Sequence, residues 1–189
     1  MSHCRLRPAK RDSTLARGEG SHVTTKDVQD LYEYGRFANR KLLEAVSTLT
    51  AEEFTRSVGG SYGSIRTTFV HLLGAEWGWL ARCGGPERGD RLKPENYPTL
   101  PSVVALADTV EGYERDFLPT LNDADLTRLV EFSFVPGQTY RMTVGQMLHH
   151  GAIHSIHHRG QVALLTRMLG HTPGNFDALF YYAGDVALR

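Results

Sequence analysis

The stretch from Thr143 to Gly170, TVGQMLHHGAIHSIHHRGQVALLTRMLG, constrains the fold of this chain more than any other. Within ten positions it holds His149, His150, His154, His157 and His158. Thr143 can cap the start of a helix, Gly170 can end one in the left-handed conformation, and no proline interrupts the residues between them. The stretch therefore predicts one long helix rich in histidine.

The faces of this predicted helix differ in character. At about 100° per residue, His154 and His158 project from the same side, one turn apart. The sector centred on this pair also carries the apolar stripe of the helix; its further members are Val144, Met147, His150, Gly151, Gln161, Val162, Leu165, Met168 and Leu169, of which His150, Gly151 and Gln161 are not apolar. The opposite sector carries His149, Arg159 and Arg167 with the small residues Gly145, Ala152 and Ala163. We therefore expect the histidine pair to face the protein interior and Arg159 to face away from it.

Two imidazoles on an interior face suggest a metal ion, which satisfies several buried nitrogens at once. Zinc and similar ions take at least three protein ligands. His150 is a poor third ligand, because positions i, i+4 and i+8 on a straight helix spread over about 12 Å. His71, inside an earlier predicted helix, is the remaining candidate. The alternatives are that the buried histidines bond to carbonyls or to each other, and that His71 lies on a plain exposed face.

His71 shares its predicted face with small residues, which would leave a cleft above a metal; they are Ser64, Thr67, Thr68, Gly74, Ala75 and Gly78. The loop from Cys83 to Pro101 is long and polar, and its length is typical of a lid or of the rim of a site. Cys83 falls at a helix end and outside any motif, so no protein nucleophile is predicted.

The rest of the chain predicts an all-α protein. Three- and four-residue apolar spacing indicates helices over Thr24–Val46, Ser64–Arg82 and Ser102–Leu121. Thr50 to Glu53 matches a capping box, and Leu129–Val135 alternates as a strand that returns over Thr139–Met142. Apolar residues between Asn175 and Arg189 predict a short final helix. A four-helix bundle, with a small hairpin before the last long helix and a short C-terminal helix, is the economical solution.

Composition limits the domain organisation and the partners. Residues 1–22 form a basic, acid-poor stretch that we expect to be a disordered tail, and residues 23–189 are expected to form the bundle. The net charge of +0 predicts no nucleic-acid partner. No apolar run approaches the roughly 20 residues that span a bilayer, so no membrane association is expected. With two cysteines, one of them in the tail, a disulfide is not indicated and a cytoplasmic location is expected.

Two separated motifs resemble the DinB/YfiT superfamily. The first is FVHLLGAEWGWL, which begins at Phe69 and contains His71; the second is His154-xxx-His158-Arg159-Gly160-Gln161. The segment from Tyr34 to Leu43, the Gly170-His171-Thr172-Pro173 turn and the aromatic tail around Asp177 resemble other parts of that family. The resemblance extends over about residues 24–182.

The resemblance implies a homodimeric four-helix bundle with one divalent metal ion per chain, zinc or nickel, bound by His71, His154 and His158. His150 and His157 match no ligand position, although His150 lies near the implied site. Gln161 is expected to contact a metal-bound water or the substrate. Gly160 is expected to permit close helix packing.

Trp77 and Glu76 are expected to pack or bond within the bundle, because Glu76 points away from His71 on the helix. The implied functions are thiol S-transfer with a small thiol co-substrate, which we favour, and metal-dependent hydrolysis. The alternative is a non-catalytic, stress-associated homodimer in which the ion ties helices together.

Overall fold

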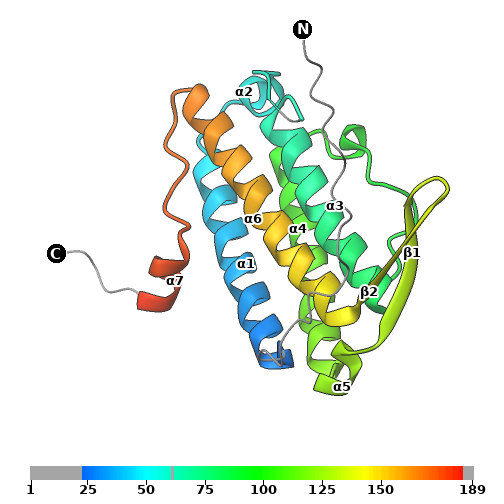
Figure 1. The fold of residues 1–189 in the computed structure, drawn as a ribbon. Helices are drawn as coiled ribbons and strands as arrows, with labels where there is room; N and C mark the ends of the chain where they lie inside the picture. Colours follow the sequence, from blue (N-terminus) through cyan, green and yellow to red (C-terminus); the bar gives the residue numbers. More distant parts are fainter. Residues whose placement is uncertain (1–22, 61, 185–189) are drawn as a thin grey trace, which may run out of the picture.

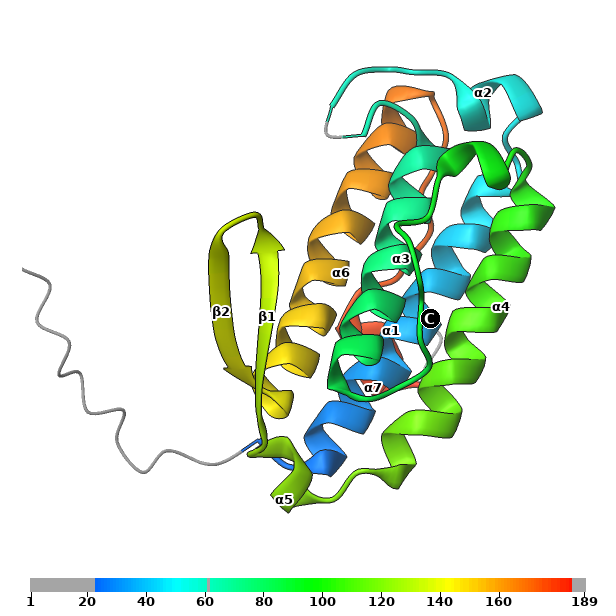
Figure 2. The same ribbon diagram turned by 90° about the vertical axis from the view of Figure 1, so that its right-hand side faces the viewer.

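The computed structural model describes residues 23–60 and 62–184, so the predicted tail of residues 1–22 lies outside the described part. Four long helices lie side by side in Figures 1 and 2 and confirm the all-α bundle; they are α1 (Thr25–Val46), α3 (Ile65–Cys83), α4 (Leu100–Phe117) and α6 (Val144–Met168). In this part of the chain, no helix is both long and apolar enough to cross a bilayer.

Each long helix begins with a reciprocal capping box. The side chain before the helix accepts a hydrogen bond from the third backbone N–H of the helix, and the side chain at that third position accepts one in return. The capping side chains are those of Thr24, Ser64, Thr99 and Thr143. The cap at Thr99, with Pro101 in the first turn, starts α4 two residues before the predicted Ser102.

The directions in which the four long helices run require a long connection between α3 and α4. Helices α1 and α6 run one way and α3 and α4 run the other, as Figures 1 and 2 show. Because α3 and α4 are parallel, residues 84–99 must return along the length of α3 before α4 can begin. The 3-10 helix η1 (Pro94–Asn96) is part of this return and packs against α3.

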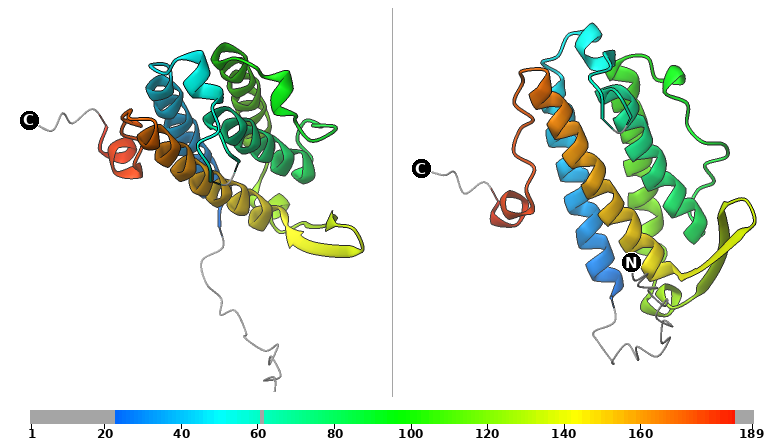
Figure 3. Two further views of the ribbon diagram at one scale, coloured as in Figure 1. Left: turned by 90° about the horizontal axis from the view of Figure 1, so that it is seen from above. Right: turned by 45° about the horizontal axis from the view of Figure 1, so that its top comes forward.

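The shorter elements close the ends of the bundle. Helix α2 (Ala51–Thr55) begins at the predicted Thr50 cap, and η2 (Leu118–Thr120) and α5 (Asp123–Leu126) follow α4. The hairpin of β1 (Leu129–Val135) and β2 (Gln138–Thr143) is antiparallel, with Leu129 opposite Thr143, and extends away from the start of α6 in Figure 3. Helix α7 (Ala178–Ala183) confirms the short final helix and lies against α1.

Two apolar clusters fill the bundle. One contains Leu42, Phe69 and Val110 from α1, α3 and α4, and the other contains Tyr32, Trp79 and Leu148 from α1, α3 and α6. Full burial of such a side chain contributes about 1.5–3 kcal/mol. The helices that carry the predicted histidines are therefore held on both sides of the site by ordinary core packing.

The expected orientation of Arg159 is wrong. Its side chain is buried, with 2% of its surface exposed, and lies between α1 and α3. Helix α6 packs against both of those helices, so its buried side chains extend from His158 through Ser155 to Ala152. A helical wheel that gives α6 a single interior face, centred on the histidines, does not predict that a second face of the helix is also buried.

Two smaller expectations for α6 are not met within a single chain. Gly160 is exposed, and no other part of the described chain lies within 4 Å of the place where its Cβ would stand, so it does not mediate close packing within the bundle. Gly151 has that role, because a Cβ there would lie 2.9 Å from the Tyr32 hydroxyl and 3.2 Å from Cβ of Trp79. Met168, expected inside, is 55% exposed.

Candidate metal centre

Helices α3 and α6 bring three imidazoles together across their interface. The Nε2 atoms of His154 and His71 are 3.4 Å apart, and those of His158 and His154 are 3.0 Å apart. All three residues offer one nitrogen within 4.8 Å of the other two. The three histidines singled out by the helix wheel and by the family resemblance thus lie together in space, although His71 is 83 residues from His154.

This arrangement fits a divalent metal ion. Zinc binds imidazole nitrogen at about 2.0–2.1 Å, so tetrahedral ligands would have nitrogens separated by about 3.3 Å. The two Nε2 separations are close to that value. The donor set is also appropriate, because imidazole suits zinc and nickel. His71, His154 and His158 would hold the ion, and this assignment stays a prediction.

Gln161 orients one of these rings. Its Oε1 accepts a hydrogen bond from Nδ1 of His158 at 2.7 Å, and its amide nitrogen lies 2.9 Å from Nε2 of His157. With Nδ1 of His158 engaged as a donor, the tautomer leaves the Nε2 lone pair free for a metal. This contact gives Gln161 a role in orienting His158, and its expected contact with metal-bound water or substrate stays a prediction.

The cluster keeps its rings neutral near pH 7. Burial, followed by the neighbouring histidines His158 and His154, lowers the pKa of His71 to about 4. Burial and the same kind of neighbours, with His158 first, lower the pKa of His154 to about 4. The pKa of His158 is also lowered by burial, against the opposing effect of its hydrogen bond to Gln161. Neutral imidazole is the metal-binding form.

Tyr62 is a site residue that the sequence did not reveal. Its hydroxyl lies 3.0 Å from Nε2 of His71, and its ring stacks on that imidazole with centroids 4.1 Å apart. It comes from the connection between α2 and α3, which turns at Gly60 and Gly63 with positive φ. Glycines around Tyr62 predict a turn, but no periodicity indicates where the ring of a loop tyrosine will point.

His71 and His154 line a cavity of about 850 Å³, a volume typical of small-molecule sites. The small residues Thr67, Gly74 and Ala75 line it, in agreement with the expected cleft. The α3–α4 crossover contributes much of the rim, as its length suggested. His150 lines the cavity too, where its ring meets Trp79 at 4.6 Å between centroids, outside the group of three converging nitrogens.

Cys83 offers no nucleophile to this cavity. Its thiol is fully buried at the end of α3, and burial raises its pKa to about 12. The thiolate is the reactive form, so a thiol with this pKa stays inert near neutral pH. The absence of Cys83 from the cavity wall agrees with the sequence expectation.

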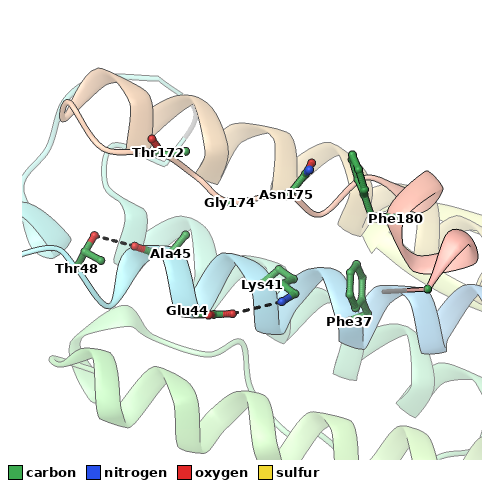
Figure 4. Close-up of a pocket in the computed structure, with 10 residues that line it drawn as sticks. Phe37, Lys41, Glu44, Ala45, Thr48, Thr172, Gly174, Asn175 and Phe180 are labelled. Carbon is green, nitrogen blue, oxygen red and sulfur yellow. Dashed lines mark hydrogen bonds and ion pairs between the residues drawn. The ribbon is translucent and has the colours of Figure 1, made fainter. Parts of the chain in front are cut away.

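A separate groove lies between α1 and the segment before α7 (Figure 4). Phe37 and Phe180 face it, and Lys41 is paired with Glu44 at 3.6 Å. None of the described residues that line it is a histidine or a cysteine. Among residues 23–60 and 62–184, the three residues that could together hold a metal ion are those between α3 and α6.

Glu76 and Arg159 form a second polar group beside the histidines. Glu76 accepts a hydrogen bond from Nδ2 of Asn39 at 3.1 Å and pairs with Arg159 at 3.5 Å. Arg159 in turn donates to Oδ1 of Asn39 at 3.2 Å. We call Asn39, Glu76 and Arg159 the buried ion cluster. These contacts agree with the expectation that Glu76 bonds within the bundle. Nε of Arg159 is buried without a hydrogen-bond partner among the described residues.

Comparisons with known proteins agree with this structure. The model of the DinB family matches residues 22–185. The uncharacterized protein YizA of Bacillus subtilis (strain 168) is 31% identical over 125 residues, which cover 66% of this chain and 77% of YizA. Protein DinB of the same strain is 21% identical over 156 residues, or 80% of this chain and 91% of that protein. A crystal structure of a DinB-like protein from Bacillus cereus ATCC 10987 shares the fold, with a TM-score of 0.68, 21% identity and coverage of 82% of this chain and 99% of the other.

Proposed function

Because the chain belongs to the DinB family and places three neutral imidazoles together beside a cavity, we propose that it binds one zinc or nickel ion per chain. The ligands in this proposal are His71, His154 and His158. The convergence of their Nε2 atoms, at separations of 3.0 and 3.4 Å, is the observation that carries it. The cavity beside them leaves space for a further ligand from solution.

We further propose that the protein is an enzyme, with thiol S-transfer favoured over hydrolysis. When bound, a divalent ion held by three imidazoles supplies a Lewis acid that keeps a thiolate or a water molecule ionised near pH 7. The chain itself holds His158 in the required tautomer through Gln161 and shields the cavity with the apolar surfaces of Trp79 and Leu92. The buried Cys83 thiol argues against a covalent intermediate on the protein.

The test uses the metal-loaded protein with bacillithiol, mycothiol and glutathione, each offered a chloro-substituted bimane as electrophile. In the expected reaction the thiol sulfur forms a bond to carbon, chloride leaves, and the thiol proton passes to the buffer. Conjugation should exceed the uncatalysed rate in wild type and fall to that rate in His71→Ala. If none of the thiols reacts, and a panel of esters and amides is not hydrolysed, the enzymatic proposal fails.

The alternative is a non-catalytic protein in which the ion ties α3 to α6. A metal ion that joins residues 83 positions apart would stabilise the bundle by restricting the unfolded chain. Two results together would favour this alternative. The bound metal would raise the stability of the protein, and a fourth protein ligand, such as the Tyr62 hydroxyl, would occupy the position at which an added thiol could bind the metal. Absorption spectra of the cobalt-substituted protein, recorded with and without thiol, distinguish the two.

We also propose that the protein is a homodimer that pairs through α6. One side of this helix exposes a stripe of large apolar side chains, between 45% and 59% exposed: Ile153, Ile156, Leu164 and Met168. Gly160 lies within the stripe and is open, so the helix of a second copy could approach closely there. The Ile156→Glu variant should be monomeric by light scattering where wild type is dimeric. An unchanged mass would remove this interface from the proposal.

A further inference from the structure

The rim of the metal cavity is strongly cationic. The crossover between α3 and α4 contributes Arg88, Arg91 and Lys93, and α3 contributes Arg82. None of the described residues that line the cavity is acidic. Although the chain has no net charge, four of its positive side chains lie around one cavity of small-molecule size.

Glycines on α3 make room for this arrangement. Arg88 donates from an Nη atom to the carbonyl of Gly74 at 2.6 Å, and Arg82 donates from an Nη atom to the carbonyl of Gly78 at 2.8 Å. A Cβ on Gly78 would stand 2.5 Å from that nitrogen of Arg88 and 3.2 Å from that of Arg82. Two guanidinium groups are thus packed around one glycine, and any side chain at this position would displace them.

Three of the rim charges, those of the crossover, are not neutralised within the described residues. Arg88, Arg91 and Lys93 form no ion pair with a carboxylate of residues 23–60 or 62–184, and Nε of Arg88 is buried without a hydrogen-bond partner. Several other arginines of the chain are paired, as in Arg36 with Glu114 at 3.2 Å. Burial and the charges of Arg82 and Arg91 lower the pKa of Arg88, because like charges oppose one another there.

We infer that the ligand of this cavity is an anionic small molecule, whose carboxylate or phosphate group binds at Arg88, Arg91 and Lys93 while its reactive end reaches the histidines. Guanidinium groups bind such oxyanions through two parallel hydrogen bonds. Trp79 and Leu92 supply apolar wall between the rim and the metal ligands. The role of the reactive end rests on the proposed function, whereas the anion subsite depends on the rim alone.

The subsite is tested first on the metal-free protein, by nuclear magnetic resonance titration with succinate and with glycerol 3-phosphate. Arg91 and Lys93 are exposed, and their side chains make no hydrogen bond to residues 23–60 or 62–184, so Arg91→Gln/Lys93→Gln should fold normally. The control Arg56→Gln/Arg167→Gln removes two exposed charges elsewhere. We expect the rim variant to bind the preferred anion about tenfold more weakly than wild type, and the control to match wild type.

The preferred anion identifies the group, carboxylate if succinate binds more tightly and phosphate if glycerol 3-phosphate does. Failure of both anions to bind wild type, or equal losses in the rim and control variants, would overturn the inference.

A second titration links the subsite to the metal. Zinc-loaded wild type should bind mercaptosuccinate at least about tenfold more tightly than the uncharged 1-thioglycerol, and this ratio should fall toward one in the rim variant. Zinc content per chain should be the same in both proteins. If wild type retains no zinc, the proposed function fails but the anion titration still decides the rim. If zinc is retained and the two thiols bind equally, the inference is wrong.

Discussion

His158 and Arg159 are neighbours in the chain, yet they belong to two polar regions of opposite character. Arg159 lies in the buried ion cluster, where cation, carboxylate and amide contact one another. His158 lies among three neutral rings that present the same kind of nitrogen to one another, two of which line a cavity. One region joins groups of opposite charge within the protein, and the other places three like nitrogens together beside a cavity.

The difference separates structural from binding roles on a single helix. Buried charges are held by partners of opposite sign, because an unpaired charge in the interior is very costly. A cluster of three imidazoles can share few hydrogen bonds among its own members, but it gains a large binding energy from a metal ion. Loss of Arg159 should therefore affect folding, and loss of His158 should affect metal binding.

The largest effect is expected in the buried ion cluster. Arg159→Met should lower the free energy of unfolding by about 3–5 kcal/mol, because it leaves the Glu76 carboxylate buried without its cation. Urea unfolding of the metal-free protein measures this change. The exposed Arg167→Met is the control and should change stability by less than about 0.5 kcal/mol. Equal losses in the two variants would show that the cluster has no special structural role.

The histidine cluster should stabilise the protein only through its ligand. Zinc at a free concentration of about 100 times its Kd should raise the free energy of unfolding by about 2.7 kcal/mol, or Tm by roughly 5–10 °C for a chain of this size. Glu76→Gln changes the buried ion cluster, so its free energy of unfolding without zinc should be lower than that of wild type. Zinc should still raise this free energy by the same amount as in wild type. An increment that disappears in Glu76→Gln would mean that the two regions are not independent.

The hydrogen bond from His158 to Gln161 should have a smaller effect on binding. Gln161→Leu should weaken zinc about tenfold, or about 1.4 kcal/mol, because the orienting acceptor of the ring is lost. His157→Ala is the control, since it removes the other neighbour of Gln161 and leaves the bond to His158. Competition with a chelator measures the zinc affinity of both variants. Equal zinc affinities would show that Gln161 does not orient the His158 ring.

The smallest change is expected with pH. The pKa values of His71 and His154 are about 4, below the ordinary value of 6.5, so these rings stay unprotonated from pH 7 to pH 5.5. Zinc affinity, corrected for protonation of the chelator, should fall by less than about tenfold over that interval, because His71 and His154 contribute no loss there and the pKa of His158 is also lowered. Each histidine of ordinary pKa would contribute a loss of about tenfold. A steeper fall should follow as the pH approaches 4. A steep loss between pH 7 and pH 5.5 would contradict the neutral cluster.

The sequence predicted what depends on helical periodicity. The shared face of His154 and His158, the caps at Thr50 and Thr143 and the all-α bundle all follow from local spacing and capping, and the structure has each of them. It did not predict burial of Arg159, because a wheel with one interior face cannot represent a helix that packs against two neighbours.

The loops contribute to the site in ways that periodicity cannot predict. Tyr62 and Arg88 reach the site from segments without a repeating pattern, where glycines indicate a turn but not the direction of a side chain. The length of the α3–α4 crossover did indicate the rim of a site, since a parallel pair of helices requires such a return.

The central claim is that His71, His154 and His158 together hold one metal ion, and the metal content of purified variants tests it most directly. Wild type and His150→Ala, which removes a neighbouring ring of the same cavity, should each retain about one zinc or nickel ion per chain after dialysis. The alanine variants of His71, His154 and His158 should each retain almost none while staying folded by circular dichroism. Full metal content in any one of these three, or an equal loss in His150→Ala, would contradict the three-histidine site.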